Sequence, residues 1–290
     1  PPRSTLFPYT TLFRSDGRQA SWDLFSRVAN LAFLLTAVVA LLVALFAEPL
    51  VRMEFGVAPG FSTQQQQLVI GLMRLNLIAT LLFSLSGLVI ASLQANQHFL
   101  LPALAPILYN IGQIFGALVL VPTVGYTIGP ITLPALGLGV HGLVYGVILG
   151  ALLHFSIQIP GLIRFGFRWK ATLRPSPEAW RVFSLMAPRL LSMACIQAIF
   201  YLRDNLASRL EVGSVSALTY GWMIFQVPET LIGTAVGVAI LPALADLFAQ
   251  GREQDFRDTV QRAVQVLLGL ALPIAAILGL GLRPLLALAF

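Results

Sequence analysis

Residues 28–47 read VANLAFLLTAVVALLVALFA, a stretch without one charged side chain. About 20 apolar residues of α-helix cross the hydrocarbon core of a bilayer, so this stretch predicts a transmembrane helix. Six more apolar runs of comparable length follow, at 69–92, 102–122, 138–163, 183–209, 215–243 and 263–290. The sequence therefore predicts an all-α fold, a polytopic transmembrane helix bundle with about seven spanning helices.

The composition of the 290 residues excludes the other broad classes of protein. Hydrophobic residues make up 57 %, charged residues only 10 %, and the mean hydropathy is +0.84. A soluble domain carries about a quarter charged residues, which this chain lacks. The single cysteine, Cys195, excludes a disulfide-stapled fold. Outer-membrane strands of roughly 10 alternating residues are much shorter than these runs.

The basic charges, 18 Lys and Arg against 12 Asp and Glu, are spread through the gaps between the apolar runs. This distribution favours loops facing anionic lipid, so we expect membrane lipids and no nucleic acid as partners. One set of alternating gaps holds ten basic residues, and the opposite set holds Arg52 and Arg209. The positive-inside rule therefore places the linker 164–182 in the cytoplasm. Its arginines and aromatic residues indicate an interfacial segment, with an intracellular gate as the alternative.

An internal repeat predicts the domain organisation. Residues 27–55 align without gaps with residues 262–290, with seven identities in 29 positions. If the last helix repeats the first, the repeat is six helices long. Because six is an even number, the two copies cross the membrane in the same direction and form two parallel lobes. We expect a two-lobe transporter fold with the remainder of the N-terminal lobe at 16–163, a basic linker at 164–182 and the start of the C-terminal lobe at 183–290. Residues 1–15 lack the features of a signal peptide and are interpreted as a non-native leader.

No motif for a nucleotide, a metal or a catalytic residue is found, so we expect a transporter and not an enzyme. Ser86 with His141 or His154 could form a hydrolase pair, but lone histidines are more often structural. Small residues four apart predict close helix packing. These are Gly112 and Gly116; Gly142, Gly146 and Gly150; and Gly233 and Gly237.

Polar side chains inside two of the apolar runs are the candidates for a substrate cavity. A charge in the membrane is costly, about 2.5–3.5 kcal/mol for a central arginine, so it faces a cavity or reaches the interface. Arg203 and Asp204 project about 100° apart, and we expect neither to be the sole partner of the other. Pro228 predicts a helix kink. The candidates are Arg189, Gln197, Arg203, Asp204, Gln226 and Glu229. For Arg189 we favour an anchoring role, and for Glu229 a place near the interface stays open.

Residues 74–112, RLNLIATLLFSLSGLVIASLQANQHFLLPALAPILYNIG, resemble the lipid II flippase family of the MurJ/MviN type. The similarity includes a short Asn/aromatic loop followed by Pro-Ala-x-Ala-Pro-x-x-x-Asn at 102–110. Residues 139–162 are similar to the sixth helix of that family, and residues 207–243 to its seventh and eighth helices. The resemblance covers about residues 16–290.

This resemblance implies a place in the multidrug/oligosaccharidyl-lipid/polysaccharide exporter superfamily, whose two six-helix lobes face a central cavity. It implies that the helices here are the third to the ninth, so that the chain is a fragment lacking the first two helices and the C-terminal helices of the family. The implied function is to flip undecaprenyl-diphosphate-linked peptidoglycan precursor (lipid II) across the bacterial inner membrane by alternating access. It implies a polyprenyl-diphosphate-linked substrate, a monomer, no metal and no cofactor, with a coupling cation left open.

One departure concerns the cationic cavity of the family. An arginine of its eighth helix corresponds here to Met223. A diphosphate is held best by fixed cations, guanidinium above all, so Arg203 or Arg189 must substitute if lipid II is the cargo. The alternatives are a cation-coupled drug or oligosaccharide-lipid exporter of the same superfamily, or a non-transporting membrane scaffold.

Overall fold

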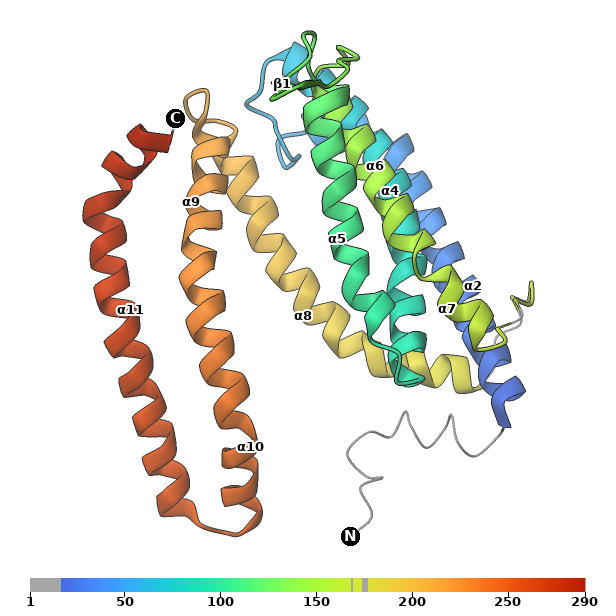
Figure 1. Cartoon of the computed structure of the whole chain (residues 1–290), viewed down its shortest axis with the longest axis vertical. Coiled ribbons are helices and arrows are strands. Elements are labelled where there is room, and N and C mark those ends of the chain that lie inside the picture. Colours follow the sequence, from blue (N-terminus) through green and yellow to red (C-terminus); the bar gives the residue numbers. More distant parts are fainter. Residues whose placement is uncertain (1–16, 168, 174–176, 290) are drawn as a thin grey trace. The chain divides into compact units, whose positions relative to one another are not determined.

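The computed structural model describes residues 17–167, 169–173 and 177–289, and helices make up most of it (Figure 1). It forms two compact units, one up to Arg209 and one from Leu210 onward. The leader inferred at 1–15 lies outside the described residues. The division into two lobes at the linker 164–182 stays a prediction.

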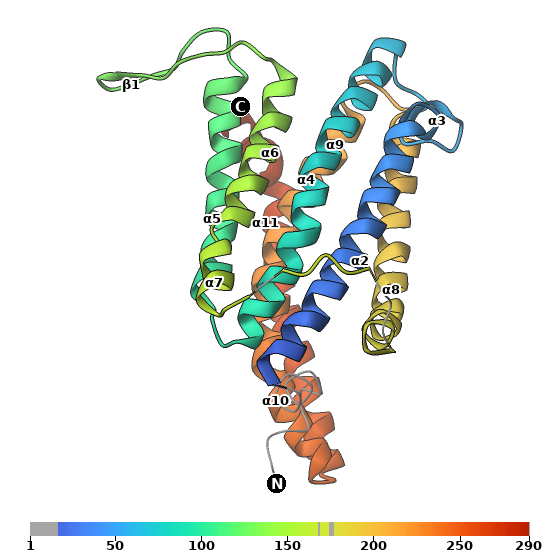
Figure 2. The ribbon, with the colours of Figure 1, turned by 90° about the vertical axis from the view of Figure 1, so that its right-hand side faces the viewer.

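The first unit holds the helices that precede residue 210. They are α2 (Gly17–Leu45), α3 (Ala47–Arg52), α4 (Thr63–Ala95), α5 (Leu100–Phe115), the π-helix η1 (Gly116–Leu120), α6 (Val140–Ser156), α7 (Ile159–Arg164) and α8 (Pro177–Ala207). Strands β1 (Thr127–Ile128) and β2 (Ile131–Thr132) form a short antiparallel hairpin between η1 and α6. Figure 2 shows this hairpin projecting beyond the ends of α5 and α6. It is a small addition to an otherwise helical unit.

The second unit is a pair of long helical stretches joined by a short turn. The first stretch consists of α9 (Ser214–Pro228), the π-helix η2 (Glu229–Thr234) and α10 (Ala235–Ala249). The second is α11 (Glu253–Ala289), with Glu253 and Asp255 in its first turn, where acidic side chains are stabilised by the helix dipole.

Six helical stretches among the described residues are long and apolar enough to cross a membrane. They are Trp22–Leu45, Thr63–Ala95, Leu100–Leu120, Val140–Arg164, Ala179–Ala207 and Glu253–Gly281. Each coincides with one predicted run. The seventh predicted run, 215–243, forms part of the continuous stretch α9–η2–α10. The predicted fold class, an all-α polytopic membrane bundle, is confirmed.

Helix α4 begins earlier than the hydropathy pattern predicts, because polar residues cap it. Helix α4 begins at Thr63 and not at 69, since Ser62 and Gln65 form a reciprocal capping box. The Ser62 backbone N–H donates to Gln65 Oε1 at 3.0 Å, and the Gln65 N–H donates to Ser62 Oγ at 3.4 Å. Helix α8 begins at Pro177, a residue suited to a first helical turn.

Glycines bring α5, η1 and α6 into backbone contact, as the spacing predicts. A Cβ added to Gly116 would lie 2.7 Å from Cα of Gly146, so no larger residue fits there. Gly112 meets Gly150 in the same way. A Cβ added to Gly233 or Gly237, the third predicted pair, would have no atom of another described element within 4 Å. Close packing is therefore confirmed for α5 and α6 only.

Two small apolar clusters lie at opposite ends of α4. Trp22, Val89, Leu93 and Leu162 form one, with Phe25, Phe165 and Phe167 packed against it. Ala47, Val51, Ala58 and Ile70 form the other. Between them, many large apolar side chains of α2, such as Leu35 and Leu41, are exposed. Exposed apolar side chains along spanning helices are the expected surface of a protein in lipid.

Candidate functional site

Arg203 and Asp204, half-buried in α8, form an ion pair with each other. The Arg203 Nη2 and Nε atoms lie 2.7 and 2.9 Å from Asp204 Oδ1. The two side chains thus contact each other although they are adjacent in the sequence, and the expectation that neither is the sole partner of the other stays a prediction. The arginine side chain is long enough to cross the 100° between adjacent positions. The guanidinium also lies over the Phe200 ring, 5.1 Å from its centroid.

Arg189 and Gln197 lie in the middle of α8, where every side chain from Ser184 to Ile199 is exposed. The buried residues of this helix lie near its two ends: Ala179 at the start, and Asn205 and Ala207 at the end. Helix α8 therefore buries side chains near its two ends, while the side chains of its middle are exposed. This arrangement decides neither the anchoring role of Arg189 nor a cavity role of Gln197, and both stay predictions.

Gln226, Glu229 and Met223 lie on successive turns at the junction of α9 and η2, in the second unit. Pro228 ends α9, and the chain continues as a π-helix instead of breaking. Because proline has no backbone N–H, one hydrogen bond of the helix is lost. The wider π turn accommodates this loss without ending the helix. All three side chains are exposed, and Gln226 and Glu229 have no side-chain partner among the described residues. Their cavity role stays a prediction.

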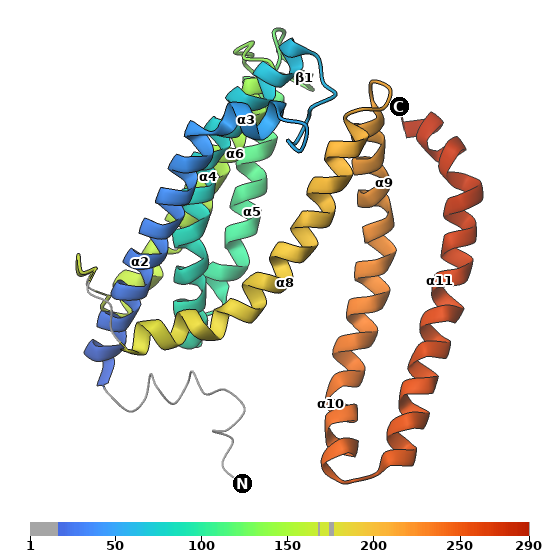
Figure 3. The same cartoon turned by 180° about the vertical axis from the view of Figure 1, so that it is seen from behind.

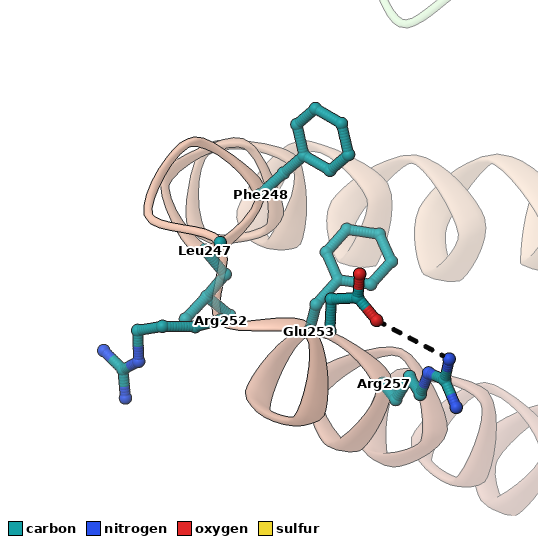
Figure 4. Close-up of a pocket in the computed structure, with 7 residues that line it drawn as sticks. Leu247, Phe248, Arg252, Glu253 and Arg257 are labelled. Carbon is teal, nitrogen blue, oxygen red and sulfur yellow. Dashed lines mark ion pairs between the residues drawn. The ribbon is translucent and has the colours of Figure 1, made fainter.

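A pocket of the second unit lies elsewhere, at the turn between α10 and α11 (Figure 4). Its lining includes Phe248 and Phe256, whose ring centroids are 6.5 Å apart. Arg257 pairs with Glu253 at 3.8 Å, and Arg252 pairs with Asp255 at 2.8 Å. These arginines are satisfied by neighbouring carboxylates, so the pocket is a feature of the turn and does not include Gln226 or Glu229.

A polar contact that sequence reasoning missed joins the end of α8 to the loop between α3 and α4. Asn205 Nδ2 donates to the backbone oxygen of Glu54 at 3.0 Å, and Arg209 Nη2 donates to the same oxygen at 2.6 Å. The backbone N–H of Gly60 donates to Ser208 Oγ at 3.2 Å. The spacing of Asn205, Ser208 and Arg209, three and four residues apart, places them on one helix face. That spacing is the feature of the sequence from which a shared contact face could have been predicted.

The linker is attached to the first turns of α2. The Lys170 ammonium pairs with Asp23, and the Trp169 indole donates to Asn30 Oδ1 at 2.8 Å. Phe167 packs edge-on against Trp22 at 5.3 Å between ring centroids. Of the aromatic residues of the predicted interfacial segment, Phe165 and Phe167 thus face the protein, while Trp169 and Trp180 are exposed. Arg168 and Arg174 lie outside the described residues.

A buried polar cluster joins α4 to the end of α6. Ser86 Oγ and His154 Nδ1 are 2.7 Å apart, and Gln158 Nε2 donates to Ser86 Oγ at 2.6 Å. The serine–histidine pair considered for hydrolysis therefore exists with His154. Ser86 and Gln158 are fully buried, and no carboxylate among the described residues contacts the histidine. This geometry fits a structural link between helices.

Comparison with known proteins identifies the family. A model of the family described as lipid II flippase MurJ matches residues 8–290. The chain belongs to the MurJ lipid II flippase family. It is therefore a membrane protein of a transporter family, and not an enzyme. No group of three or more His, Cys, Asp or Glu residues suited to a metal ion is found among the residues that the structure describes.

Three relatives illustrate the extent of the similarity. The lipid II flippase MurJ of Burkholderia cenocepacia is 28 % identical over 243 residues, 81 % of this chain and 45 % of the relative. Probable lipid II flippases MurJ of Bdellovibrio bacteriovorus and Rhizobium tropici are 27 and 28 % identical, over 85 and 91 % of this chain and 45 and 47 % of their own lengths. The chain spans about half the length of the relatives it matches.

Proposed function

We propose that this chain is part of a flippase that carries lipid II across the bacterial inner membrane by alternating access. The observation that carries the proposal is the match to the MurJ family over residues 8–290, together with the six apolar helices that coincide with predicted spans. We also propose that the linker 164–182 faces the cytoplasm and that the protein works as a monomer without a cofactor. The coupling cation is left open.

The chemistry of Arg203 supports a role in contacting the diphosphate. A guanidinium has five N–H donors, and the Asp204 carboxylate takes one each from Nε and Nη2. Three N–H donors remain for phosphate oxygens. The ion pair and the Phe200 ring hold the guanidinium in place, so little side-chain entropy is lost when the substrate binds. Asp204 is in this proposal a positioning residue for Arg203.

Translocation of the lipid II headgroup by a full-length protein that contains this chain, reconstituted in vesicles, tests the proposal. Arg203→Ala is expected to lower the rate by at least about tenfold, the equivalent of ~1.4 kcal/mol for one charge-assisted contact. Arg257→Ala removes an exposed arginine that is paired with Glu253 and serves as the matched control. An unchanged rate in Arg203→Ala would remove that residue from the site, and no translocation by the unaltered protein would refute the function.

A second function is favoured by one observation. By the resemblance to the family, Met223 corresponds to an arginine of its eighth helix, and a diphosphate would then have one fixed cation fewer. A cation-coupled exporter of drugs or oligosaccharide-lipids would use Asp204 or Glu229 as carboxylates for its coupling ion. Substrate efflux that depends on a sodium or proton gradient and is insensitive to lipid II would support that alternative over lipid II flipping.

A further inference from the structure

The loop between η1 and α6, residues 121–139, carries the β1–β2 hairpin and is fixed at its base. Where the chain returns to the helices, the backbone N–H groups of Gly137 and Leu138 donate to the oxygens of Pro122 and Leu120 at 2.7 and 2.8 Å. We call residues 121–139 the hairpin loop. Because its two ends are bonded to each other next to η1 and α6, the loop leaves the helices in a defined direction.

The tip of the hairpin loop is held by its own backbone bonds. The two strands pair in antiparallel register, and the Leu133 N–H donates to the Tyr126 oxygen at 2.9 Å beyond the strand ends. Gly129 has a φ of +60° and is followed by Pro130, as suits a tight hairpin turn that needs a positive φ at its first central residue. The loop is therefore an ordered projection and not an extended connection.

The hairpin loop runs sideways from the helix ends. Figure 2 shows it leaving α5 and α6 across their axes, at the end of the first unit opposite α7. Seen from behind in Figure 3, it lies at the same end as α3. Its base joins two stretches that are apolar enough to span a membrane, Leu100–Leu120 and Val140–Arg164. The loop thus begins where those spans meet the membrane surface, and it runs along that surface.

The side chains of the hairpin loop are not those of a surface in water. Residues 75–163, which include the loop, contain no Asp, Glu, Lys or Arg. Large apolar side chains are nevertheless exposed on it, with Val124 at 78 %, Leu136 at 60 % and Tyr126 at 54 %. A protein surface that faces water carries about 25–35 % charged residues. The exposed apolar groups therefore match an apolar partner without charge.

The backbone of the hairpin loop limits how deep in a bilayer it can lie. Each strand of a two-stranded hairpin has one edge whose backbone groups are unpaired, and such groups are too costly for the hydrocarbon core. The exposed hydroxyls of Thr127 and Thr132, 3.4 Å apart, also require polar surroundings. Tyrosine, with an apolar ring and a polar hydroxyl, is typical of the headgroup level, where Tyr126 would lie. These features together fit the boundary between headgroups and acyl chains.

We propose that the hairpin loop is a lipid-binding surface, which lies in the headgroup region of the leaflet opposite the basic linker and anchors the ends of α5 and α6 there. The distribution of Lys and Arg assigns the leaflet. Because the loop has no charge, it binds lipid through apolar contact and does not require anionic headgroups. The inference is independent of what the protein transports.

The first test measures the depth of the loop in vesicles of neutral phosphatidylcholine. A nitroxide is attached to Val124→Cys in a full-length protein that contains this chain, with Cys195 and any other cysteine changed to serine. Its collision rates with oxygen, which concentrates in apolar surroundings, and with a water-soluble nickel complex are compared. The ratio of oxygen to nickel collisions is expected to be at least about threefold higher than at Gln64→Cys, an exposed position in the first turn of α4.

Equal ratios at the two positions would overturn the proposal. The ratio at Val124→Cys is expected to stay the same when phosphatidylglycerol or salt is added, because no charge takes part. A high ratio that requires phosphatidylglycerol would contradict binding through apolar contact. If Val124→Cys is in water in vesicles but blocked to a maleimide in cells, the partner is a protein and the lipid assignment is wrong.

The second test changes the exposed apolar side chains and reads the depth elsewhere on the loop. The nitroxide is placed at Thr132→Cys, on the strand opposite Tyr126. Val124→Asp with Tyr126→Asp is expected to lower the oxygen-to-nickel ratio to that of Gln64→Cys, since carboxylates draw the loop into water. The matched control, Val124→Ile with Tyr126→Phe, keeps the apolar surface and is expected to leave the ratio unchanged. An unchanged ratio in the aspartate variant would show that these side chains do not hold the loop in lipid.

Discussion

Lys170 of the linker and Asp23 of α2 form an ion pair across 147 residues of sequence, with 2.6 Å between Nζ and Oδ1. Lys170 is the only lysine of the chain, and the other 17 of its 18 Lys and Arg residues are arginines. The pair is largely exposed, so its own contribution to stability is at most about 1 kcal/mol. Its neighbours Asn30 and Trp169 add a hydrogen-bonded attachment. The linker is thereby held along α2.

Asn30→Ala is expected to release the linker. Asn30 Nδ2 donates to the backbone oxygens of Lys170 and Thr172, and its Oδ1 accepts from Trp169. Loss of these bonds costs about 1–3 kcal/mol locally. Hydrogen exchange of residues 169–173 measures the effect, and it is expected to rise at least tenfold. Asn76→Ala, at an exposed position of α4, is the control, and equal protection in both variants would contradict the attachment.

Gly146→Ala is expected to destabilise the packing of η1 against α6 by about 1–3 kcal/mol. The new methyl group would lie 2.7 Å from Cα of Gly116, with backbone on both sides and no flexible side chain to move. Gly87→Ala in α4 meets no atom within 4 Å and is expected to be neutral or slightly stabilising. Thermal unfolding in detergent compares the two. A similar midpoint for both variants would show that the close approach is not required.

Ser86→Ala is expected to lower stability by about 1–3 kcal/mol, because Gln158 and His154 lose their shared buried partner. Ser84→Ala is the control, since among the described residues the Ser84 hydroxyl bonds to the Leu81 oxygen of its own helix and to no other helix. Unfolding by denaturant provides the measurement. We also expect no labelling of Ser86 by a fluorophosphonate, because the hydroxyl is fully buried. Labelling at Ser86 would favour the hydrolase interpretation.

Met223→Arg is expected to raise the affinity of a full-length protein for lipid II by roughly tenfold, the value of one bidentate guanidinium–phosphate contact of ~1.4 kcal/mol. Met223 is exposed and one turn from Gln226, so the longer side chain is accommodated without disturbing the helix. Met223→Leu keeps the volume and adds no charge. Binding measured at several salt concentrations separates the two variants. A gain for both, or for neither, would argue against a phosphate site near α9.

The spanning helices could be predicted because apolar length alone selects an α-helix in lipid, where every backbone group must be bonded within the segment. The glycines of α5 and α6 were predicted for a similar reason, since residues four apart share a helix face. The first and last residues of the helices were harder to predict, as the capping residues Ser62 and Gln65 of α4 show. Polar residues there have no hydropathy signal, although their capping chemistry can be recognised afterwards.

Only part of the candidate site could be predicted from the sequence. The costly charges Arg203 and Asp204 could be identified, but their pairing depends on the rotamer of a long side chain, which spacing does not determine. The kink at Pro228 became a π-helix, because the local geometry of the following residues decides how a missing N–H is accommodated.

By itself, the order of the residues determined the all-α membrane class, the spans and the similarity to the lipid II flippases, because each depends on properties that lie close together along the chain. Only the tertiary structure decided that Lys170 meets Asp23, that Ser86 meets His154 and that Asn205 meets the loop at Glu54. Those contacts join positions at least 68 residues apart. Such partners are chosen by the packing of helices, and the backbone oxygens that Asn205 and Arg209 bind are the same chemical group in every residue.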